Sequence, residues 1–345
     1  MSLLSGISDF FGLDIGTTAI RLVQLSGRYP KTLVKYAYTP IDPKLSLSDA
    51  ASDQQKVANL VLDLCSQAKM TTRNVVVGIP SQRLFTTIVD VDKMTPKELQ
   101  KTIMFQADSL IPTPINESKI DWAILGDSPK DSGKMEILLS SVSNKYIETR
   151  LDSLESVGLN IIGFEPENLA AVRALIKPGT TTTIMVLDVG STGTDIVITS
   201  DDAPRLSRSI AVGTQAIIKS AAQNLNIDDN QAQQFVFKFG LDATKLDGQL
   251  SKAIQNTIET LNLEIDKSIK FYQSRYPNKK LEKIIITGPA SLIPNFATTI
   301  ASRLMVNVEI GNAWHNVTFP EARQNELLTV ASQFSVAVGL AGRDE

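Results

Sequence analysis

The stretch FGLDIGTTAIRLVQL, residues 11–25, is matched later in the chain by MVLDVGSTGTDIVIT, residues 185–199. Each copy holds an apolar run with an Asp, then an apolar residue and a Gly, then small or hydroxyl residues and a second apolar run. Asp14 and Asp188 take the same place in the two copies. Asp and Gly between two β-rich runs are a usual signal of a β-hairpin. We therefore predict one hairpin unit used twice, about half a chain apart, in a molecule with two lobes.

The composition is that of a globular protein with more than one domain. The chain has 345 residues, which is too long for a single compact core. Hydrophobic residues make up 43% and charged residues 21%, a balance that argues against a disordered chain. The net charge of -3 gives no electrostatic basis for nucleic-acid binding, which needs a surplus of Lys and Arg.

The sequence predicts a cytoplasmic protein that does not itself insert into a membrane. No apolar run approaches the ~18 residues that a membrane span needs. The N-terminal stretch MSLLSGISDF lacks the basic and long apolar regions of a secretory signal. The single cysteine, Cys65, cannot form a disulfide within the chain, and its place beside a helical apolar stripe favours a packing role. His315 has no Cys or second His near it, so we expect no catalytic or metal-binding role for it.

The middle of the first half is predicted to be an inserted α/β unit. A helix is expected to open at Thr95, with Pro96 as its first residue and Glu98 in its first turn. Strands are expected at residues 84–91, 119–125 and 134–142, a second helix from residue 144, and a closing strand over NIIGFEP. The resulting order, β-α-β-β-α-β, is typical of a small α/β sandwich.

The two predicted hairpin tips could bind phosphate. Backbone N–H groups and hydroxyls meet at each tip, and Gly16 and Gly190 permit close approach of the backbone. Asp14 and Asp188 would then lie near phosphate, which is unfavourable unless a divalent cation such as Mg²⁺ lies between them. A plain β-hairpin turn remains the alternative for either tip alone, whereas the matched pair favours phosphate binding.

These residues resemble a known superfamily. The paired hairpins look like the phosphate loops of the actin, sugar kinase and heat-shock chaperone superfamily. ITGPAS (286–291) is similar to its adenosine-binding turn, and VAVGLAG (336–342) to its closing helix. Within that superfamily the chain resembles the type IV pilus PilM family in three stretches: FQADSLIPTPINESKIDWAILG (105–126), GFEPENLAAVRAL (163–175) and LEIDKSIKFYQ (263–273).

The resemblance implies an α/β fold of two actin-like, ribonuclease-H-like halves with a small inserted α/β domain, the architecture of FtsA and PilM. The first lobe is expected to comprise residues 1–81, 163–183 and 330–345. The inserted domain is expected over residues 82–162. The second lobe, with a nucleoside-binding subdomain, is expected over residues 184–329.

The resemblance also implies a site for ATP or ADP with Mg²⁺. Asp14 and Asp188 would hold the metal, and Asp188 and Glu165 would be the catalytic acids, with Glu165 orienting a water. Enrichment of a helix N-terminus in acids is the alternative role of Glu165 and Glu167. An exposed ion pair is the alternative role of Glu264 and Lys267. The implied nucleotide contacts are Asp14, Gly16, Thr17 and Thr18, then Asp188, Gly190, Ser191, Thr192 and Gly193, and finally Gly213, Glu264, Lys267 and Gly288.

The nucleoside side departs from the superfamily pattern. Pro289 follows Gly288 where relatives carry a second Gly, so one backbone N–H and some room are lost. Gln233 and Val236 stand where relatives often carry an acid and a base, and Gly213 is followed by Thr rather than Gly. We therefore expect weak nucleotide binding with hydrolysis weak or absent.

The function that the resemblance implies is a cytoplasmic scaffold of the pilus assembly platform, recruited to the inner face of the membrane by protein partners. Its expected partners are a PilN-like inner-membrane protein, other platform proteins and further copies of itself in an oligomer or ring. The N-terminal peptide of the PilN-like protein would bind in a groove of the first lobe and inserted domain, with residues 84–91 and 111–122 as lining candidates or, alternatively, as core positions. An FtsA-like filament protein and an active kinase remain the rivals, although the end of the chain at AGRDE lacks FtsA's amphipathic membrane helix.

Overall fold

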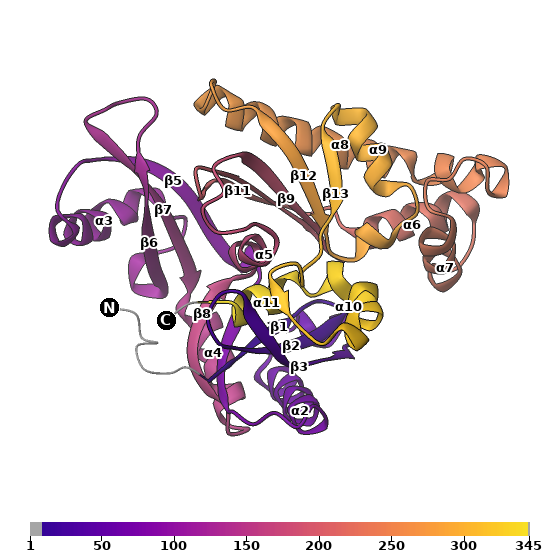
Figure 1. The fold of residues 1–345 in the computed structure, drawn as a ribbon, viewed down its shortest axis with the longest axis horizontal. Coiled ribbons are helices and arrows are strands. Elements are labelled where there is room, and N and C mark those ends of the chain that lie inside the picture. The colour runs from indigo at the N-terminus through magenta and orange to yellow at the C-terminus, as the bar shows by residue number, and fades with distance from the viewer. Residues whose placement is uncertain (1–8, 344–345) are drawn as a thin grey trace.

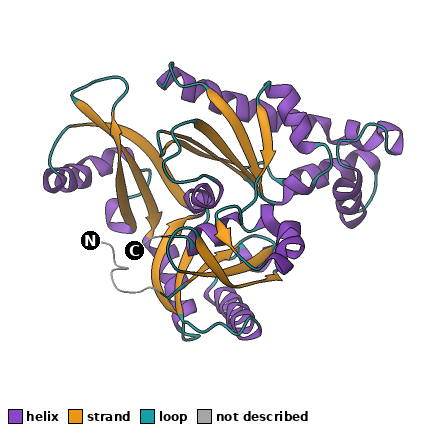
Figure 2. Ribbon diagram, in the orientation of Figure 1, coloured by secondary structure: helices purple, strands orange, loops and turns teal. Residues whose placement is uncertain are grey.

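The structure is a computed structural model that describes residues 9–343 and, within them, the backbone alone at residues 104–108. Residues 1–8 and 344–345, which we expected in the first lobe, lie outside the described residues, as do the side chains of residues 105–108 in the family-like stretch 105–126. The described chain forms three sheets, which converge on the centre of the molecule (Figure 1). Helices α2, α3, α7 and α8 lie toward the outside, as Figure 2 shows.

The first sheet builds the first lobe and has the strand order β14-β3-β2-β1-β4-β8. One face is covered by α2 (Ala51–Gln67), whose apolar residues recur at helical spacing and whose Cys65 is buried in the core. The strands are β1 (Phe11–Ile15), β2 (Ala19–Ser26), β3 (Lys31–Pro40), β4 (Asn74–Ile79), β8 (Asn160–Pro166) and β14 (Val317–Thr318), and the further helices are α1 (Pro43–Ser46) and α4 (Asn144–Glu155).

The second sheet builds the second lobe and has the order β11-β10-β9-β12-β13. Helices pack against it around one apolar core. The strands are β9 (Thr183–Val189), β10 (Thr194–Ser200), β11 (Ala203–Ile210), β12 (Leu281–Thr287) and β13 (Asn307–Ile310), and the helices are α6 (Thr214–Leu225), α7 (Asp229–Phe239), α8 (Gln249–Arg275) and α9 (Phe296–Leu304).

The third sheet is the inserted unit, with the order β5-β7-β6 over β5 (Leu84–Asp92), β6 (Ser118–Asp127) and β7 (Lys134–Ser143). Helix α3 (Pro96–Leu110) packs on one face. Its N-terminus forms the expected capping box, because Glu98 Oε2 accepts from the Thr95 backbone N–H at 2.9 Å and Thr95 Oγ1 accepts from the Glu98 N–H at 3.4 Å.

Two elements expected in the inserted unit lie with the first lobe instead. Strand β8 pairs in parallel with β4, and α4 packs against α2, with Leu154 in the core of the first lobe. Likewise β14, within the range expected for the second lobe, pairs with β3, and Trp314 packs in a core shared by both lobes. Sequence order does not show which core an apolar face will cover, and these differences arise from that.

Helices α5 (Glu167–Leu175) and α11 (Ser335–Ala341) cross between the two larger sheets at the centre of the molecule (Figure 1), while α10 (Gln324–Val330) lies beside them. The crossing is very close. A Cβ on Gly339 would lie 1.7 Å from the backbone oxygen of Ala170, and one on Gly12 of β1 would lie 2.5 Å from that of Ala337. Only glycine permits such approach, so these two positions set the distance between the lobes.

Both predicted hairpins are present and have the same register. Asp14 lies opposite Arg21 in β1–β2, and Asp188 lies opposite Asp195 in β9–β10. Each tip is closed by one backbone hydrogen bond, from Gly16 N to Ala19 O at 3.1 Å and from Gly190 N to Gly193 O at 2.9 Å. None of the helices in residues 9–343 is both long and apolar enough to cross a membrane.

Candidate functional site

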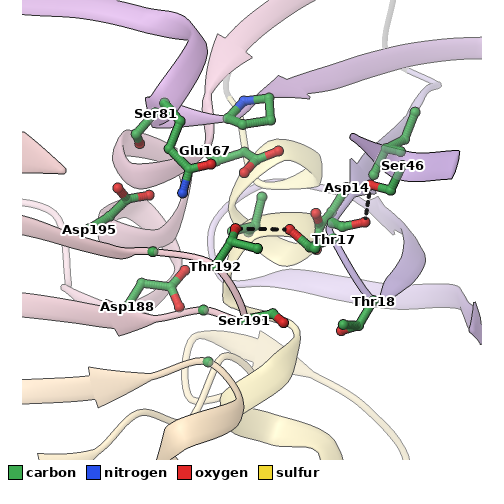
Figure 3. Close-up of a pocket in the computed structure, with 18 of the residues that line it drawn as sticks. Asp14, Thr17, Thr18, Ser46, Ser81, Glu167, Asp188, Ser191, Thr192 and Asp195 are labelled. Carbon is green, nitrogen blue, oxygen red and sulfur yellow. Dashed lines mark hydrogen bonds between the residues drawn. The ribbon is translucent and has the colours of Figure 1, made fainter. Parts of the chain in front are cut away.

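The two hairpin tips face each other across one cleft, although they come from different sheets (Figure 3). The hydroxyl oxygens of Thr17 and Thr192 are 3.5 Å apart and link the tips. The cleft has a volume of about 140 Å³. Residues 14–18 and 190–193 line it, together with Gly288 and Pro289 and with polar side chains from the first lobe: Arg21, Ser46, Asp49, Ser81, Gln82, Arg83, Tyr146, Arg150 and Glu167.

The first hairpin is held by an ion pair and a hydroxyl. Arg21 Nη1 lies 3.2 Å from Asp14 Oδ2, and both side chains are largely buried. Ser46 donates to the Gly16 carbonyl at 2.8 Å. The Asp14 carboxylate therefore has a fixed cationic neighbour, and the guanidinium of Arg21 brings positive charge to the cleft.

The second hairpin is held by the start of α6. The backbone N–H groups of Thr214 and Gln215 donate to the carbonyls of Gly190 and Ser191, both at 2.9 Å. A Cβ on Gly213 would lie 2.5 Å from the Ser191 oxygen, so Gly213 supports the hairpin from behind and does not line the cleft. Gly288 has φ +80, and a Cβ there would lie 2.3 Å from Asp188 Oδ1, so this turn needs glycine.

Four carboxylates gather in the cleft: Asp14, Glu167, Asp188 and Asp195 (Figure 3). Burial raises the pKa of all four, and mutual repulsion adds to this for Glu167 and Asp188. The pKa of Asp188 is raised to about 7 by burial, then by Asp195 and Asp14, against the opposing effect of Arg21. Such a cluster favours bound protons or a bound cation.

The cleft residues fit a cation that is bound partly by protein carboxylates and partly by the phosphate oxygens of a bound molecule. Within the described residues, no three His, Cys, Asp or Glu side chains converge closely enough to hold a metal ion by themselves. Glu167 Oε1 and Asp195 Oδ1 are buried, and neither has a hydrogen-bond partner in the part of the chain that the structure describes. Mg²⁺ usually keeps several waters and is bound by one or two carboxylates plus phosphate oxygens, which suits this donor set.

The cleft acids give folding a testable pH dependence. An acid whose pKa is higher in the folded state binds more protons when folded, so stability falls as pH rises from its unfolded to its folded pKa. For Asp188 that window runs from the ordinary Asp pKa of 3.8 to about 7. We expect Asp188→Asn to melt a few degrees above the parent near about pH 7.5, because it removes a cost on the order of a few kcal/mol. Melting curves should show this difference vanishing near about pH 4, and a difference that is constant with pH would contradict the assignment.

Several residues predicted for the site lie elsewhere. Glu165 of β8 is ion-paired with Arg173 and does not line the cleft. Glu264 is paired with Lys267 and Arg208 on the surface of α8, outside the cleft.

The two positions expected to weaken the nucleoside site also lie away from the cleft. Gln233 is exposed, and Val236 is fully buried in the core of the second lobe. Pro289 does line the cleft next to Gly288. Outside the cleft, burial raises the pKa of Cys65 to about 11, and His315 is exposed with Nδ1 2.9 Å from the Asn312 oxygen.

Arg21, Asp195 and Glu167 line the cleft but were not predicted as site residues. The first two could have been found, because Arg21 and Asp195 take the same place in the repeated stretches, seven residues after Asp14 and Asp188. In each hairpin the residue seven positions after the Asp lies opposite it on the second strand, so the two side chains are neighbours. Glu167 begins α5 immediately after Pro166, and only the position of that helix start shows that it faces the cleft.

A second cavity, which we call the groove, lies between the inserted sheet and the first lobe. Its volume is about 310 Å³. Its floor is the face of the inserted sheet opposite α3. Ala123 of β6 lies there beside its cross-strand partner Leu138 of β7, and Val142 lies farther along β7 on the same face. Its wall comes from the first lobe: Ile79, Ile147, Phe164, Pro166 and Leu169. The predicted candidates fall partly here, since Leu84 and residues 119–123 line it, whereas Ile111 packs in the core of the inserted unit.

Comparisons with known proteins agree with this architecture. A solved structure described as the PilM-PilN type IV pilus biogenesis complex matches with a TM-score of 0.83 at 24% identity, covering 96% of this chain and 97% of that one. The ethanolamine utilization protein EutJ from Carboxydothermus hydrogenoformans matches with a TM-score of 0.59 at 14% identity, covering 96% and 88%. MreB5 of Spiroplasma citri bound to AMPPNP matches with a TM-score of 0.55 at 13% identity, covering 96% and 95%.

These likenesses confirm the predicted fold class, a mixed α/β fold of the actin-like ATPase type. The model of the type IV pilus assembly protein PilM family matches residues 12–345, almost the whole chain. It spans both hairpins, the inserted unit and the crossing helices. The chain therefore belongs to the type IV pilus assembly protein PilM family.

Proposed function

We propose that this protein is a nucleotide-binding scaffold of the type IV pilus assembly platform. It takes Mg-ATP between the two hairpins and holds the N-terminal peptide of a PilN-like inner-membrane protein in the groove. The observation that carries the nucleotide half is the meeting of two matched Gly-containing tips, one from each lobe, in a cleft with four buried acids. Family membership and the PilM-PilN complex among the similar structures support the partner half.

The roles of the cleft residues follow from their chemistry. The tips at residues 16–18 and 190–193 offer backbone N–H groups and hydroxyls to phosphate oxygens, and Arg21 offers a guanidinium. Asp14 and Asp188 would hold Mg²⁺, which neutralises phosphate charge when bound. Glu167, rather than Glu165, is the acid placed to orient a water, and its raised pKa suits a group that accepts a proton.

The cleft is narrow for a whole nucleotide. Its volume of about 140 Å³ is below the roughly 300 Å³ at which typical small-molecule sites begin. The contact between Thr17 and Thr192 leaves no room for phosphate between these two hydroxyls. Mg-ATP binding therefore requires the tips to move apart, and the ring of Pro289 beside Gly288 further restricts the nucleoside side. Both features favour slow or absent hydrolysis.

A melting experiment tests the nucleotide half. Ligand at ~100 times its dissociation constant stabilises a protein by roughly 2.7 kcal/mol, which raises Tm by a few degrees. Thr18 is exposed at the first tip, so Thr18→Glu should fold normally and place a negative charge against the phosphates. We expect Mg-ATP to raise the Tm of the parent but not of Thr18→Glu.

The matched control is Thr260→Glu, which makes the same change at an exposed position of α8 outside the cleft. It should keep the full shift in Tm. An absent shift in the parent at millimolar Mg-ATP, or an equal shift in Thr18→Glu, would mean that the hairpins do not bind nucleotide.

The groove suits an extended apolar peptide. Its lining is mostly aliphatic and aromatic, and β6 is an edge strand, which presents its outer backbone groups to an added strand. Main-chain pairing with β6 would supply affinity, and apolar side chains at alternate positions would enter the groove.

A pair of neighbouring substitutions tests the partner half. Ala123 faces the groove from an exposed position, whereas Ile124 is the next residue of the strand, points to the other face and is 49% exposed. We expect Ala123→Glu to weaken binding of a PilN-like N-terminal peptide about tenfold or more, because it places a charge in an apolar site. Ile124→Glu should bind normally. Fluorescence anisotropy of a labelled peptide measures both, and equal affinities would place the peptide elsewhere.

A further inference from the structure

A third cavity opens beside the cleft on the side of the first lobe, and we call it the side chamber. Its volume is about 320 Å³, far above the ~30 Å³ share of one water. Its lining has two parts. Five residues are shared with the cleft (Asp49, Gln82, Arg83, Tyr146 and Arg150), and four are its own (Gln54, Ser143, Lys145 and Thr149). The chamber and the cleft are therefore neighbours with a common wall.

The two cavities differ in charge. The side chamber is lined by three cations, Arg83, Lys145 and Arg150, and by one acid, Asp49. The cleft is lined by the four carboxylates described above and Asp49, against Arg21 and the two shared arginines. An anion that leaves the cleft for the side chamber would thus pass from acidic to cationic surroundings. The electrostatic potential of the lining side chains favours this movement.

Arg150 is the central cation of the shared wall. It comes from α4, is 5% exposed, and its Nη1 is buried with no hydrogen-bond partner among the described residues. Tyr146 lies between two guanidinium groups, with Arg150 5.7 Å and Arg83 5.5 Å from its ring centre. The Asp49 carboxylate accepts from Arg83 Nη2 at 2.8 Å and from Nη1 at 3.0 Å. Arg150 has no ion pair in the described chain and acts on the Glu167 carboxylate only from a greater distance, lowering the pKa of that acid. A buried guanidinium with an unpaired N–H is costly unless an anion binds it.

The remaining lining fits a protonated oxyanion. Lys145 and the hydroxyls of Ser143 and Thr149 are donors to its oxygens. Gln54 is 4% exposed, and its Oε1 is a buried acceptor that has no hydrogen-bond donor within residues 9–343 as described. Inorganic phosphate near neutral pH carries both acceptor oxygens and a hydroxyl, so it can use donors and acceptor together.

We propose that the side chamber binds inorganic phosphate, with Arg150 as its principal ligand. Binding of free phosphate does not depend on nucleotide turnover. The chamber could also bind phosphate released by ATP hydrolysis in the cleft. This second role rests on the proposed function, because only hydrolysis in the cleft would supply that phosphate.

Calorimetric titration of the nucleotide-free and Mg²⁺-free protein with sodium phosphate at constant ionic strength tests this assignment. Loss of hydrogen bonds to a charged partner weakens binding about tenfold or more, so we expect that loss in affinity for Arg150→Gln and a smaller loss for Arg150→Lys. Lys145 is exposed, so Lys145→Gln should fold normally and lose affinity a few-fold. Arg208→Gln, the same change at a partly exposed arginine outside both cavities, should bind phosphate as the parent does.

The outcomes separate this inference from the proposed function. Absence of saturable phosphate binding in the parent, or an affinity equal to that of the parent in both Arg150→Gln and Lys145→Gln, overturns the side chamber even if Mg-ATP still raises Tm. Phosphate binding that is weakened in Arg150→Gln and Lys145→Gln but not in Arg208→Gln upholds the chamber even if Mg-ATP has no effect on Tm.

Discussion

Gly339→Ala is expected to destabilise the protein by about 3 kcal/mol or more, because the added methyl group has no room. The added Cβ would lie 1.7 Å from the backbone oxygen of Ala170, where real contacts are never so short. The obstacle is backbone on both sides, so no side-chain rotation can relieve it, and α11 must move away from α5. Urea unfolding followed by circular dichroism measures the loss.

The control for this substitution is Gly133→Ala. The nearest atom to its Cβ would be a flexible Asp131 carboxylate oxygen at 3.3 Å, and Gly133 does not need a positive φ. Its stability should change by less than about 1 kcal/mol. If Gly339→Ala were equally mild, the close crossing of α5 and α11 would be wrong.

Glu136→Ala is expected to cost about 3–5 kcal/mol, because it leaves the buried Arg205 without a counter-ion and Arg275 with Asp90 alone. Glu136 of β7 is fully buried and accepts from three groups of the second lobe: Arg205 Nη1 at 2.7 Å, Arg275 Nε at 2.8 Å and the Tyr276 hydroxyl at 2.7 Å. Arg275 also binds Asp90 of β5 at 2.8 Å. This network joins the inserted sheet to the second lobe.

Glu264→Gln is the matched control for Glu136→Ala, since Glu264 also has two cationic partners but lies at the surface. Exposed ion pairs contribute little, so its stability should change by less than about 1 kcal/mol. Hydrogen exchange should also rise in β5 and β7 of Glu136→Ala, because the sheet loses its attachment to the second lobe. Unchanged exchange there would show that other contacts hold the sheet.

The sequence was sufficient to predict the repeated hairpins and the structures that depend on neighbouring residues. The matched stretches around Asp14 and Asp188 predicted both hairpins and their convergence, and the Thr95–Glu98 pair predicted a helix start. Both depend on neighbours in the chain, so the amino-acid pattern contains the information.

The errors concern contacts between distant segments. Glu165 and Glu167 are two residues apart, and which of them faces the cleft depends on where β8 ends and α5 begins. Helix α4 has an amphipathic pattern that suits either core, and only its packing against α2 places it in the first lobe. Arg150, buried on that helix, could not be connected with the cleft until this packing was known.

The contact between Gly339 and Ala170 has a mechanical consequence. Helices that pack through interlocking ridges of side chains resist turning, whereas two backbones that meet at a point have no ridges there to interlock. The crossing can therefore serve as a pivot, and displacement grows with distance from it. The inserted sheet continues the first lobe through β4 and α4 and is tied to the second by Glu136, so it acts as a strut across the joint. Any rotation of the lobes that separates Thr17 from Thr192 must therefore also strain the inserted sheet. The groove, which lies beside that sheet, would change shape with it.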